Sequence, residues 1–476
     1  PMAINPPKFQ EEHNNGEDYV DAAAMKEAWL AYTKGDAKEE CVDLMFEYSG
    51  IALDWLVEHG FVFGEPLTGF NPETDIWRCK YQYTGASGNT YHITATYFDS
   101  FVEDFESLGG EYMLETEAYE LLYDESTNTV TGAKARSYDG TEYIITAQKV
   151  ILATGGFGGN PEMEDEYIST NPYFDFSSEG GWGLLGSYQN DGAGVRMALS
   201  IGAGTYNIGM SPMVHMAGSA GFLTQFEYHI TDAIQSSTNR NMVWTEGDLP
   251  MYLGIAGNSL AVDSDGKRFA SETGVAMLDP WKAGPTYYSI YSSEQIGEVV
   301  RNGLKYPCTG PASINLGACG AIPNNTPLPN AVQVLDAAVE AGFAAKADTL
   351  SELASLLGMG SLEETVAAYN GYCETGVDEE FGKPAEYLDP IGSGPYYAIT
   401  MRSYCYSTCG ALDVDEELRV LRTDGQPIGG LYAAGLDSMG VLFTDKNCYV
   451  TYGGVAQGWA YTSGRLAGER GASSLQ

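Results

Sequence analysis

The sequence predicts an α/β fold (α+β overall) in which one domain is assembled from both ends of the chain and is interrupted by a second, inserted domain. Three observations predict it. Strand-like segments alternate with helices near both ends, a mainly helical stretch lies between them, and glycine-rich turns follow directly after apolar strands. The 476 residues suffice for two or three domains of the usual ~100–200 residues.

Helices are predicted in three regions of the chain. Residues 19–60 contain two amphipathic segments that each end in a glycine, which commonly follows the last turn of a helix. Residues 332–375 are again helical in pattern, and Ser361 followed by Glu364 predicts a capping box at the start of their last helix. A final helix is predicted over about residues 454–468.

Strands are predicted over residues 110–155 and again over residues 396–434, where short runs rich in β-branched and aromatic residues are separated by turns. Asp-Gly pairs that begin at Asp139 and at Asp424 are typical of tight turns between paired strands. The apolar run from Lys149 to Ala153 predicts a fully buried parallel strand.

The composition argues against several classes of protein. The net charge is −41 and only 24 Lys and Arg are spread along the chain, so nucleic-acid binding is not expected. The acidity favours a well-solvated surface, with docking of a basic redox partner as the alternative. No apolar run reaches the ~18 residues that a membrane span requires. No signal segment is visible, which leaves the location open between the cytoplasm and the cell envelope.

The eight cysteines do not predict a metal site or a disulfide framework. None of them forms a C-x-x-C pair, and the chain is long enough to build a core without such staples. Cys405 and Cys409 would face one way only on a helix, and their segment reads as strand or loop. We therefore expect no metal in this protein.

Three glycine-rich segments stand where α/β proteins bind nucleotides, at the carboxyl ends of strands and at the starts of helices. The first is a Thr-Gly-Gly turn after the strand at 149–153. The second is an Asn-Asp-Gly turn before a short helix, and the third is a strand end followed by a glycine pair before the last helix. Together they predict a cofactor site made of Ala153, Thr154, Gly155, Gly156, Asn190, Asp191, Gly192, Gly435, Asp437, Gly454, Val455 and Ala456.

Six segments, in this order, carry a family resemblance. They are VILATGGFGGNPEM, NDGAGVRMALSIGAG, DSDGKRF, ETVAAYNGYC, GSGPYYAI, and GLYAAG with the later GGVAQGWAYTSGRLAGE. They resemble the FAD-dependent flavoprotein family of fumarate reductase and succinate dehydrogenase, which also includes 3-ketosteroid dehydrogenases and other bacterial enone reductases. The resemblance covers nearly the whole chain.

The resemblance implies FAD as the cofactor and a Rossmann-like FAD-binding domain interrupted by a capping domain. The implied boundaries are 1–212 for the first part of the FAD-binding domain, 213–390 for the capping and substrate domain, and 391–476 for the last part. It implies that the last helix points its N-terminal N–H groups at the flavin, where they stabilise negative charge on the reduced ring.

Two departures from the family narrow these expectations. The family opens with a strand–G-x-G-x-x-G–helix unit that holds the FAD pyrophosphate, and we expect that this chain begins after that unit. Fumarate reductases bind substrate carboxylates with arginines, whereas the matching segments 270–276 and 446–452 carry none here. The segment 404–410 also lacks the family's paired histidines. Fumarate and succinate are therefore not favoured as substrates.

Tyrosines occupy several of these positions. The resemblance to ketosteroid dehydrogenases implies that Tyr449 and the Gly453 N–H hold the substrate carbonyl oxygen, as an oxyanion hole does. Tyr406 would pass a proton to the α-carbon while the flavin gives a hydride to the β-carbon. His215 falls in a segment whose histidine lies near flavin and substrate in the family. The other residues predicted to contact the substrate are Tyr404, Tyr452 and Tyr288.

These expectations leave three functions open. The favoured one is an FAD-dependent oxidoreductase that reduces or forms a C=C bond α,β to a carbonyl in a hydrophobic substrate, such as a ketosteroid or another enone. The second is a fumarate- or acrylate-type carboxylate reductase that uses other cations, such as Arg402 or Lys446. The third is a flavin-less binding protein. Electrons are expected from NAD(P)H, an electron-donor protein or a further domain, because no haem or ferredoxin motif is present.

Overall fold

The computed structural model describes residues 1–71, 76–81, 95–173, 182–184, 186–216, 249–273, 280–305, 325–447, 449 and 454–475. The chain divides into two compact units, each described here by itself. Unit 1 comprises residues 1–173, 186–213 and 407–476, and unit 2 comprises residues 174–185 and 214–406. The assignment of a cofactor domain and a capping domain from the sequence stays a prediction.

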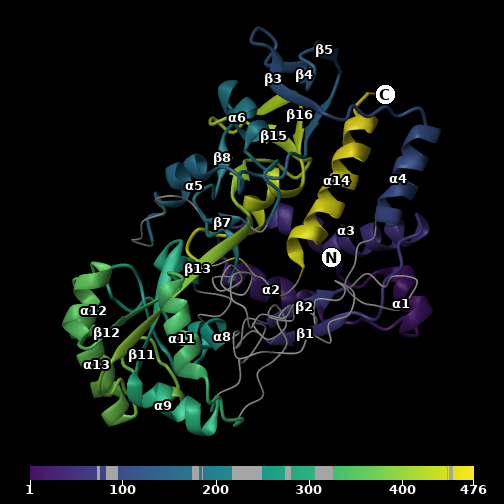
Figure 1. The fold of residues 1–476 in the computed structure, drawn as a ribbon. Helices are drawn as coiled ribbons and strands as arrows, with labels where there is room; N and C mark the ends of the chain where they lie inside the picture. The colour runs from purple at the N-terminus through teal and green to yellow at the C-terminus, as the bar shows by residue number, and fades with distance from the viewer. Residues whose placement is uncertain are drawn as a thin grey trace. The chain divides into compact units, whose positions relative to one another are not determined.

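Unit 1 combines helices and strands from both ends of the chain (Figure 1). Its helices are α1 (Pro7–His13), α2 (Ala22–Tyr32), α3 (Glu39–Glu58), α4 (Ala95–Ser107), α5 (Pro161–Ile168), α6 (Ala193–Ser200) and α14 (Val455–Ser473). Its strands are β1 (Leu67–Asn71), β2 (Ile76–Lys80), β3 (Thr116–Asp124), β4 (Thr129–Ser137), β5 (Glu142–Thr146), β6 (Val150–Leu152), β8 (Thr205–Tyr206), β14 (Ala411–Leu412), β15 (Arg419–Leu421) and β16 (Pro427–Ala433). The short 3-10 helices η5 (Gly435–Asp437) and η6 (Met439–Leu442) follow β16.

The main sheet of unit 1 joins strands that lie far apart in the sequence. Its order is β15-β16-β4-β3, with β5 paired to β4 and β6 paired to β16. Strands β6 and β16 run parallel, with Leu431 opposite Val150 and Ala433 opposite Leu152. The carboxyl ends of these two strands therefore meet at one edge of the sheet, where parallel sheets commonly bind ligands.

Helix α14 completes the core of unit 1. It packs against α3 (Figure 1), and it also contacts η5. Its Trp459 is 0% exposed, and the Nε1 of that residue donates to the Ser438 hydroxyl at 3.1 Å. A second tryptophan, Trp29 of α2, donates from Nε1 to the Leu442 carbonyl at 2.7 Å across a separation of 413 residues. The core therefore needs residues from both ends of the chain.

The turns predicted at the two Asp-Gly pairs are confirmed. Gly140 lies between β4 and β5 with φ of +88°, and Gly425 lies between β15 and β16 with φ of +81°. Glycine adopts such angles without a steric penalty because it has no Cβ. The strand predicted over 149–153 forms as β6, but the expectation of full burial is wrong, because Ile151 is 40% exposed.

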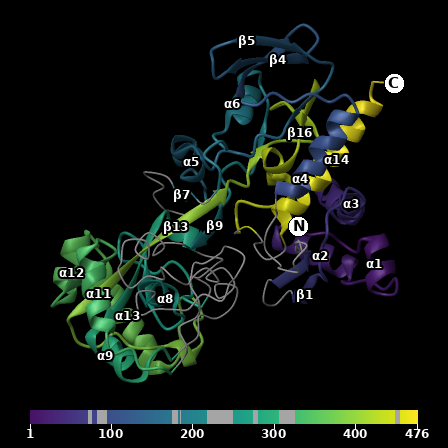
Figure 2. The ribbon, with the colours of Figure 1, turned by 45° about the vertical axis from the view of Figure 1, so that its right-hand side comes forward.

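Unit 2 is built around a second sheet. Its strands are β7 (Gly183–Leu184), β9 (Met213–Met216, which begins at the last residue of unit 1), β10 (Leu260–Val262), β11 (Thr286–Ser292), β12 (Ala344–Ala347) and β13 (Tyr396–Ser407, which ends in unit 1). Its helices are α8 (Leu249–Ile255), η2 (Pro280–Ala283), α9 (Ser293–Asn302), α11 (Ala331–Glu340), α12 (Leu350–Leu357), α13 (Leu362–Thr375) and η4 (Ala385–Tyr387). The sheet order is β10-β11-β13-β12, with β7 and β9 also paired to β13, and Figure 2 shows α11, α12 and α13 gathered beside it.

Two local predictions in unit 2 are wrong. Strand β12 interrupts the region predicted as helix, because pairing with β13, which sets Ala345 opposite Ala398, overrides the helix preference of alanine. The capping box predicted at Ser361 does not form, since the Ser361 hydroxyl donates to Asp265 Oδ2 at 3.0 Å instead. Capping boxes are present at the starts of α9 and α12.

Hydroxyl groups from β11 satisfy carbonyls near the end of α8. Tyr287 and Ser289 donate to the Gly254 carbonyl at 3.0 and 2.9 Å, and Tyr291 donates to the Leu253 carbonyl at 2.7 Å. The last carbonyls of a helix lack partners within it, so side-chain donors are needed when the end is buried. Both tyrosines are at most 1% exposed and belong to the interior of unit 2.

Tyr291→Phe is expected to lower the free energy of unfolding by about 1–3 kcal/mol, because the buried Leu253 carbonyl loses its donor. Urea denaturation followed by tryptophan fluorescence measures the loss. The control is Tyr138→Phe, at a side chain that is 91% exposed, where the change should stay within about 0.5 kcal/mol. Equal losses in the two variants would contradict the role given to the Tyr291 bond.

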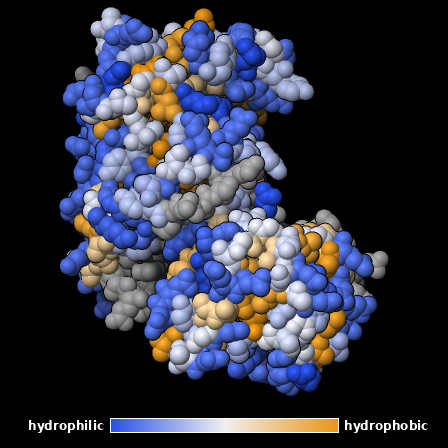
Figure 3. Space-filling view, turned by 90° about the vertical axis from the view of Figure 1, so that its left-hand side faces the viewer, coloured by the Kyte–Doolittle hydropathy of each residue, from blue (hydrophilic) through white to orange (hydrophobic). Residues whose placement is uncertain are grey.

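The face of the molecule drawn in Figure 3 is mainly hydrophilic, with hydrophobic residues in smaller groups, which agrees with the net charge of −41. Among the described residues, no helix is both long enough and apolar enough to cross a bilayer. In the same part of the chain, no three or more His, Cys, Asp or Glu side chains are grouped so that they could hold a metal ion.

Candidate functional site

The turn that follows β6 is bound to a single carboxylate, that of Asp437. Its Oδ2 accepts hydrogen bonds from the N–H and from the hydroxyl of Thr154, the latter at 2.8 Å. Its Oδ1 accepts the Gly156 N–H at 2.9 Å, and the Gly155 N–H also contributes. Four residues predicted to contact the cofactor are thus joined directly to one another.

The carboxyl group of Asp437 is buried and is held by hydrogen bonds from Thr154 and Gly156. Its side chain is 0% exposed, and no described Lys, Arg or His forms an ion pair with it. Burial raises the pKa of Asp437, and the hydrogen bonds from Thr154 and Gly156 oppose that rise. Every partner is a hydrogen-bond donor, a set that favours the ionised carboxylate.

Two consecutive glycines give the turn its shape. Gly155 and Gly156 have φ of +88° and +74°, and successive N–H groups in such a turn form a concave anion site, or nest. A Cβ on Gly156 would lie 2.7 Å from Thr408 Oγ1, so a larger residue here would require Thr408 to shift. The far side of the turn is held by Ser407, which donates to the Gly155 carbonyl at 2.9 Å, and by Thr408, which accepts the Phe157 N–H at 3.0 Å.

The second glycine-rich segment leads into α6 and touches the first. The Gly192 N–H donates to the Gly156 carbonyl at 3.0 Å, and the Asn190 side chain lies against the same turn. Asp191 Oδ1 accepts the N–H of Ala193, the first residue of α6, at 2.9 Å. The structure therefore brings the first two predicted segments together.

The third segment continues from β16 into α14. Gly435, with φ of +61°, donates its N–H to the Ser463 hydroxyl of α14 at 2.8 Å. Gly454 is the N-cap of α14 with φ of +69°, and its carbonyl accepts the Met2 N–H at 2.9 Å. Gly435 thus lies beside Asp437, whereas Gly454 lies beside the first residues of the chain.

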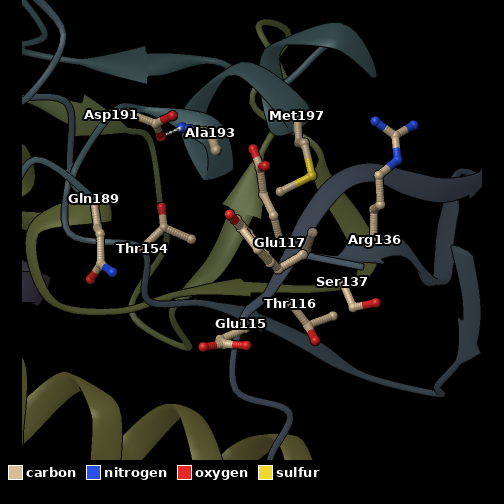
Figure 4. Close-up of a pocket in the computed structure, with 12 residues that line it drawn as sticks. Glu115, Thr116, Glu117, Arg136, Ser137, Thr154, Gln189, Asp191, Ala193 and Met197 are labelled. Atoms are coloured by element: carbon tan, nitrogen blue, oxygen red, sulfur yellow. Dashed lines mark hydrogen bonds between the residues drawn. The ribbon is translucent and has the colours of Figure 1, made fainter. Parts of the chain in front are cut away.

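A pocket of about 760 Å³ lies between the first two segments and the strands β3 and β4 (Figure 4). Such a volume is within the ~300–1,000 Å³ typical of small-molecule sites. Its lining residues are Glu115, Thr116, Glu117, Ala118, Arg136, Ser137, Tyr138, Thr154, Gln189, Asp191, Ala193 and Met197. Thr154 and Asp191 are the two predicted cofactor residues among them.

The charges of this pocket fit the adenosine end of FAD. Glu115, Glu117 and Asp191 supply carboxylates, which accept hydrogen bonds from ribose hydroxyls and from an adenine amino group. The cation among the lining residues, Arg136, pairs with Glu142 at 2.5 Å, and its guanidinium points away from Thr154 and Asp191 in Figure 4. These carboxylates would repel the pyrophosphate of FAD. The pyrophosphate therefore needs hydrogen-bond donors other than the side chains of this pocket.

Tyr449 is buried beside the start of α14 and is 3% exposed. Its N–H donates to the Ser211 hydroxyl at 3.0 Å, and its ring meets Phe443 edge-on with centroids 5.5 Å apart. Burial raises the pKa of its phenol, and a hydrogen bond from the Ala456 N–H opposes the rise. Tyr449 therefore reaches the helix N-terminus, residues 454–456, that is predicted to face the flavin.

Two other tyrosines differ in their surroundings. Tyr406, near the end of β13, is 44% exposed, and the buried part of its ring raises the pKa of its phenol. Tyr288, on β11, packs in part against the core of unit 2, and burial raises its pKa as well. Of these two, Tyr406 has the ring more open to a small molecule.

The remaining predicted substrate contacts stay predictions. Tyr404 lies on β13 and His215 lies on β9, and for both the backbone alone is described. Gly453 and Tyr452 fall outside the described residues.

Sequence reasoning missed two groups of residues. Ser407 and Thr408 hold the turn after β6, and their place at the end of a long predicted strand is the one signal that marks them. Glu117 and Arg136 line the pocket from β3 and β4, and no local motif distinguishes them from other exposed charges on strands.

Comparisons with known proteins place the chain among flavoproteins. A family model described as FAD binding domain matches residues 8–448. The chain is 28% identical to a vinyl phenol reductase of Lactiplantibacillus plantarum, over 82% of this chain and 75% of that protein. It is 26% identical to an NADH:acrylate oxidoreductase of Vibrio harveyi, over 90% of this chain but 36% of that protein.

Among solved structures, the chain matches a 3-ketosteroid Δ1-dehydrogenase from Sterolibacterium denitrificans, in complex with 1,4-androstadiene-3,17-dione. The TM-score is 0.59 at 18% identity, and the match covers 96% of this chain and 89% of that one. At this identity the likeness shows a common fold.

Proposed function

The chain belongs to the FAD binding domain family, and from that premise we propose that it is an FAD-dependent oxidoreductase that reduces, or forms, an activated C=C bond. The proposed substrate is hydrophobic and uncharged, with the double bond α,β to a carbonyl, as in a ketosteroid or another enone. The names of the relatives support the reaction type, because vinyl phenol and acrylate each contain a C=C bond.

The ion pair between Lys446 and Asp36 supports an uncharged substrate, and this observation carries the proposal. Lys446 is the cation of the segment in which the family places a substrate-binding arginine. Its Nζ lies 2.7 Å from each carboxylate oxygen of Asp36, which also accepts the Thr444 hydroxyl at 2.6 Å. A cation already neutralised by a carboxylate attracts a substrate carboxylate weakly.

The chemistry divides between cofactor and protein. FAD, when bound, supplies the hydride for the β-carbon. Tyr406 gives a proton to the α-carbon, since a phenol is protonated at neutral pH, and partial burial raises its pKa further. Tyr449 and the Gly453 N–H donate to the substrate carbonyl oxygen and stabilise the negative charge that develops there.

Tyr449 is suited to that role because its oxygen accepts the Ala456 N–H, so that its own proton serves as a donor. The residues assigned to the remaining walls of the substrate site are His215, Tyr404, Tyr452 and Tyr288. We propose that NAD(P)H or an electron-donor protein supplies the electrons that reduce the flavin.

A carboxylate reductase is the second candidate, and the likeness to the acrylate enzyme favours it. It requires a cation at the substrate site, and Arg402 of β13 is the candidate on unit 2. This alternative predicts that activity depends on Arg402, whereas an enone reductase does not need that charge.

The test is a substrate panel with the full-length protein under anaerobic conditions. The reduced holoenzyme is mixed with a ketosteroid, a simple enone, a vinyl phenol, acrylate or fumarate, and reoxidation of the flavin is followed by absorbance. We expect an uncharged substrate to reoxidise the flavin at least tenfold faster than acrylate or fumarate. Faster reoxidation by the carboxylates would establish the second candidate, and a protein that purifies without flavin and binds no FAD would favour a binding protein.

A further inference from the structure

The nest after β6 is an anion site that the chain fills with its own carboxylate. Backbone nests commonly hold phosphates or other anions, and this one lies in a segment predicted to meet the cofactor. Its N–H groups, those of Thr154, Gly155 and Gly156, instead point at Asp437. These donors are therefore not available to the cofactor, although the segment lies at its predicted site.

Thr154 links this nest to the wall of the pocket. It lines the pocket, while its N–H and hydroxyl are both bound by Asp437. The first turn of α6 packs directly on it, because a Cβ on Gly194 would lie 2.3 Å from Thr154 Oγ1. A shift of Thr154 would therefore displace the strand end and the start of α6 together.

We propose that Asp437 is a positioning residue for FAD: its carboxylate fills the nest and fixes the Thr154–Gly156 turn, and thereby the pocket wall, in the shape that the cofactor requires. The proposal rests on the binding of FAD by this chain. It replaces the expectation that Asp437 and the N–H groups of the turn contact the cofactor themselves.

A second buried carboxylate in unit 1 provides a matched comparison. Asp54 of α3 is 6% exposed and accepts the N–H groups of Lys8 and Phe9 at 2.8 and 3.1 Å. Burial raises its pKa also, against the same kind of backbone hydrogen bonds. Asp54 is therefore a buried carboxyl group that accepts backbone N–H groups, as Asp437 is, but it does not lie at the pocket.

The experiment compares Asp437→Ala with Asp54→Ala in the full-length protein, with and without added formate. Formate is a small carboxylate that can enter an emptied nest. FAD affinity is measured by titrating the apoprotein and following flavin fluorescence, and stability is measured by thermal unfolding. Asp437→Ala is expected to weaken FAD binding at least tenfold and to regain most of the affinity in formate. Asp54→Ala is expected to lose stability but to bind FAD as the wild type does.

Two results would overturn the proposal: wild-type FAD affinity in Asp437→Ala, or recovery of stability without recovery of affinity when formate is added. If Asp437→Ala does not fold, Asp437→Asn decides the matter. Its amide keeps one accepting oxygen, so a smaller loss of affinity is expected, and an unchanged affinity would overturn the proposal. The wild-type titration is run first, because a wild type that binds no FAD refutes the cofactor assignment and not the role of Asp437.

Discussion

Arg268→Met is expected to destabilise unit 2 by about 3–5 kcal/mol, because the buried Asp378 carboxylate loses the cation that pairs with it and Glu272 is left with Lys383. The Arg268 side chain is 1% exposed, and it binds Glu272 and Asp378, each at 2.9 Å. Lys383 adds a contact to Glu272 at 3.3 Å, and both of these side chains are 0% exposed. The measurement is urea denaturation of the purified protein, with a shift of the transition to lower urea.

Arg301→Met is the matched control for this variant. Its partner Glu298 lies 3.0 Å away, and both side chains are more than half exposed, at 64% and 53%. Exposed pairs contribute about 0–1 kcal/mol, so the transition should barely move. A loss in Arg268→Met no larger than in the control would contradict the importance of the buried network.

The same network predicts a pH dependence. Burial raises the pKa of Asp378, but the hydrogen bonds from Arg268 outweigh this and hold the pKa well below its usual range. The stability that Asp378 contributes is therefore present above its unfolded pKa of about 3.9 and is lost as the pH falls below it. Arg268→Met should show a weaker loss over that acidic range.

Tyr406→Phe is expected to slow reoxidation of the reduced flavin by an enone about 10²–10⁴-fold, the usual contribution of a general acid. Substrate binding should change little, because the ring remains and one hydroxyl is lost. Stopped-flow mixing of reduced holoenzyme with substrate measures the rate and, from its concentration dependence, the binding.

The control on the same strand is Tyr396→Phe. Tyr396 lies ten residues before Tyr406 in the sequence, and its hydroxyl donates to the Gly392 carbonyl at 3.1 Å. Its loss should change the rate less than about twofold. Unchanged reoxidation in Tyr406→Phe would remove that residue from the mechanism and direct attention to the other tyrosines.

The sequence predicts those parts of the fold that are fixed by neighbouring residues. The predicted α/β class and FAD-binding family are confirmed, and so are the turns at Gly140 and Gly425. Each of these predictions rests on short local patterns, the glycine-rich segments and the Asp-Gly pairs. Strand β12 is not predicted, because its alanines prefer a helix until β13 pairs with them. The Ser361 hydroxyl likewise makes no capping bond to α13, because it donates to Asp265 of a distant segment.

The candidate site shows the same division. The glycines of the Thr154–Gly156 turn stand out in the sequence, because a strand followed by two glycines is a local pattern. Asp437 is also predicted as a cofactor residue, but its bonds to the turn, which span 281 and 283 residues, are not. Such contacts depend on the parallel pairing of β6 with β16, which no local pattern specifies. The pocket lining from β3 and β4 is unpredicted for the same reason.

The bond from Trp29 to Leu442 has a consequence for how the chain folds during synthesis. Residues 174–185 and 214–406, which form unit 2, all leave the ribosome before residues 407–476, which complete unit 1. Unit 2 can therefore fold first, while the apolar faces of α2 and α3 stay uncovered until η6 and α14 have been synthesised. Contacts of such long sequence separation slow folding, and the uncovered apolar surface promotes aggregation in the meantime. We therefore expect unit 1, rather than unit 2, to be the part of the chain that needs chaperones to fold.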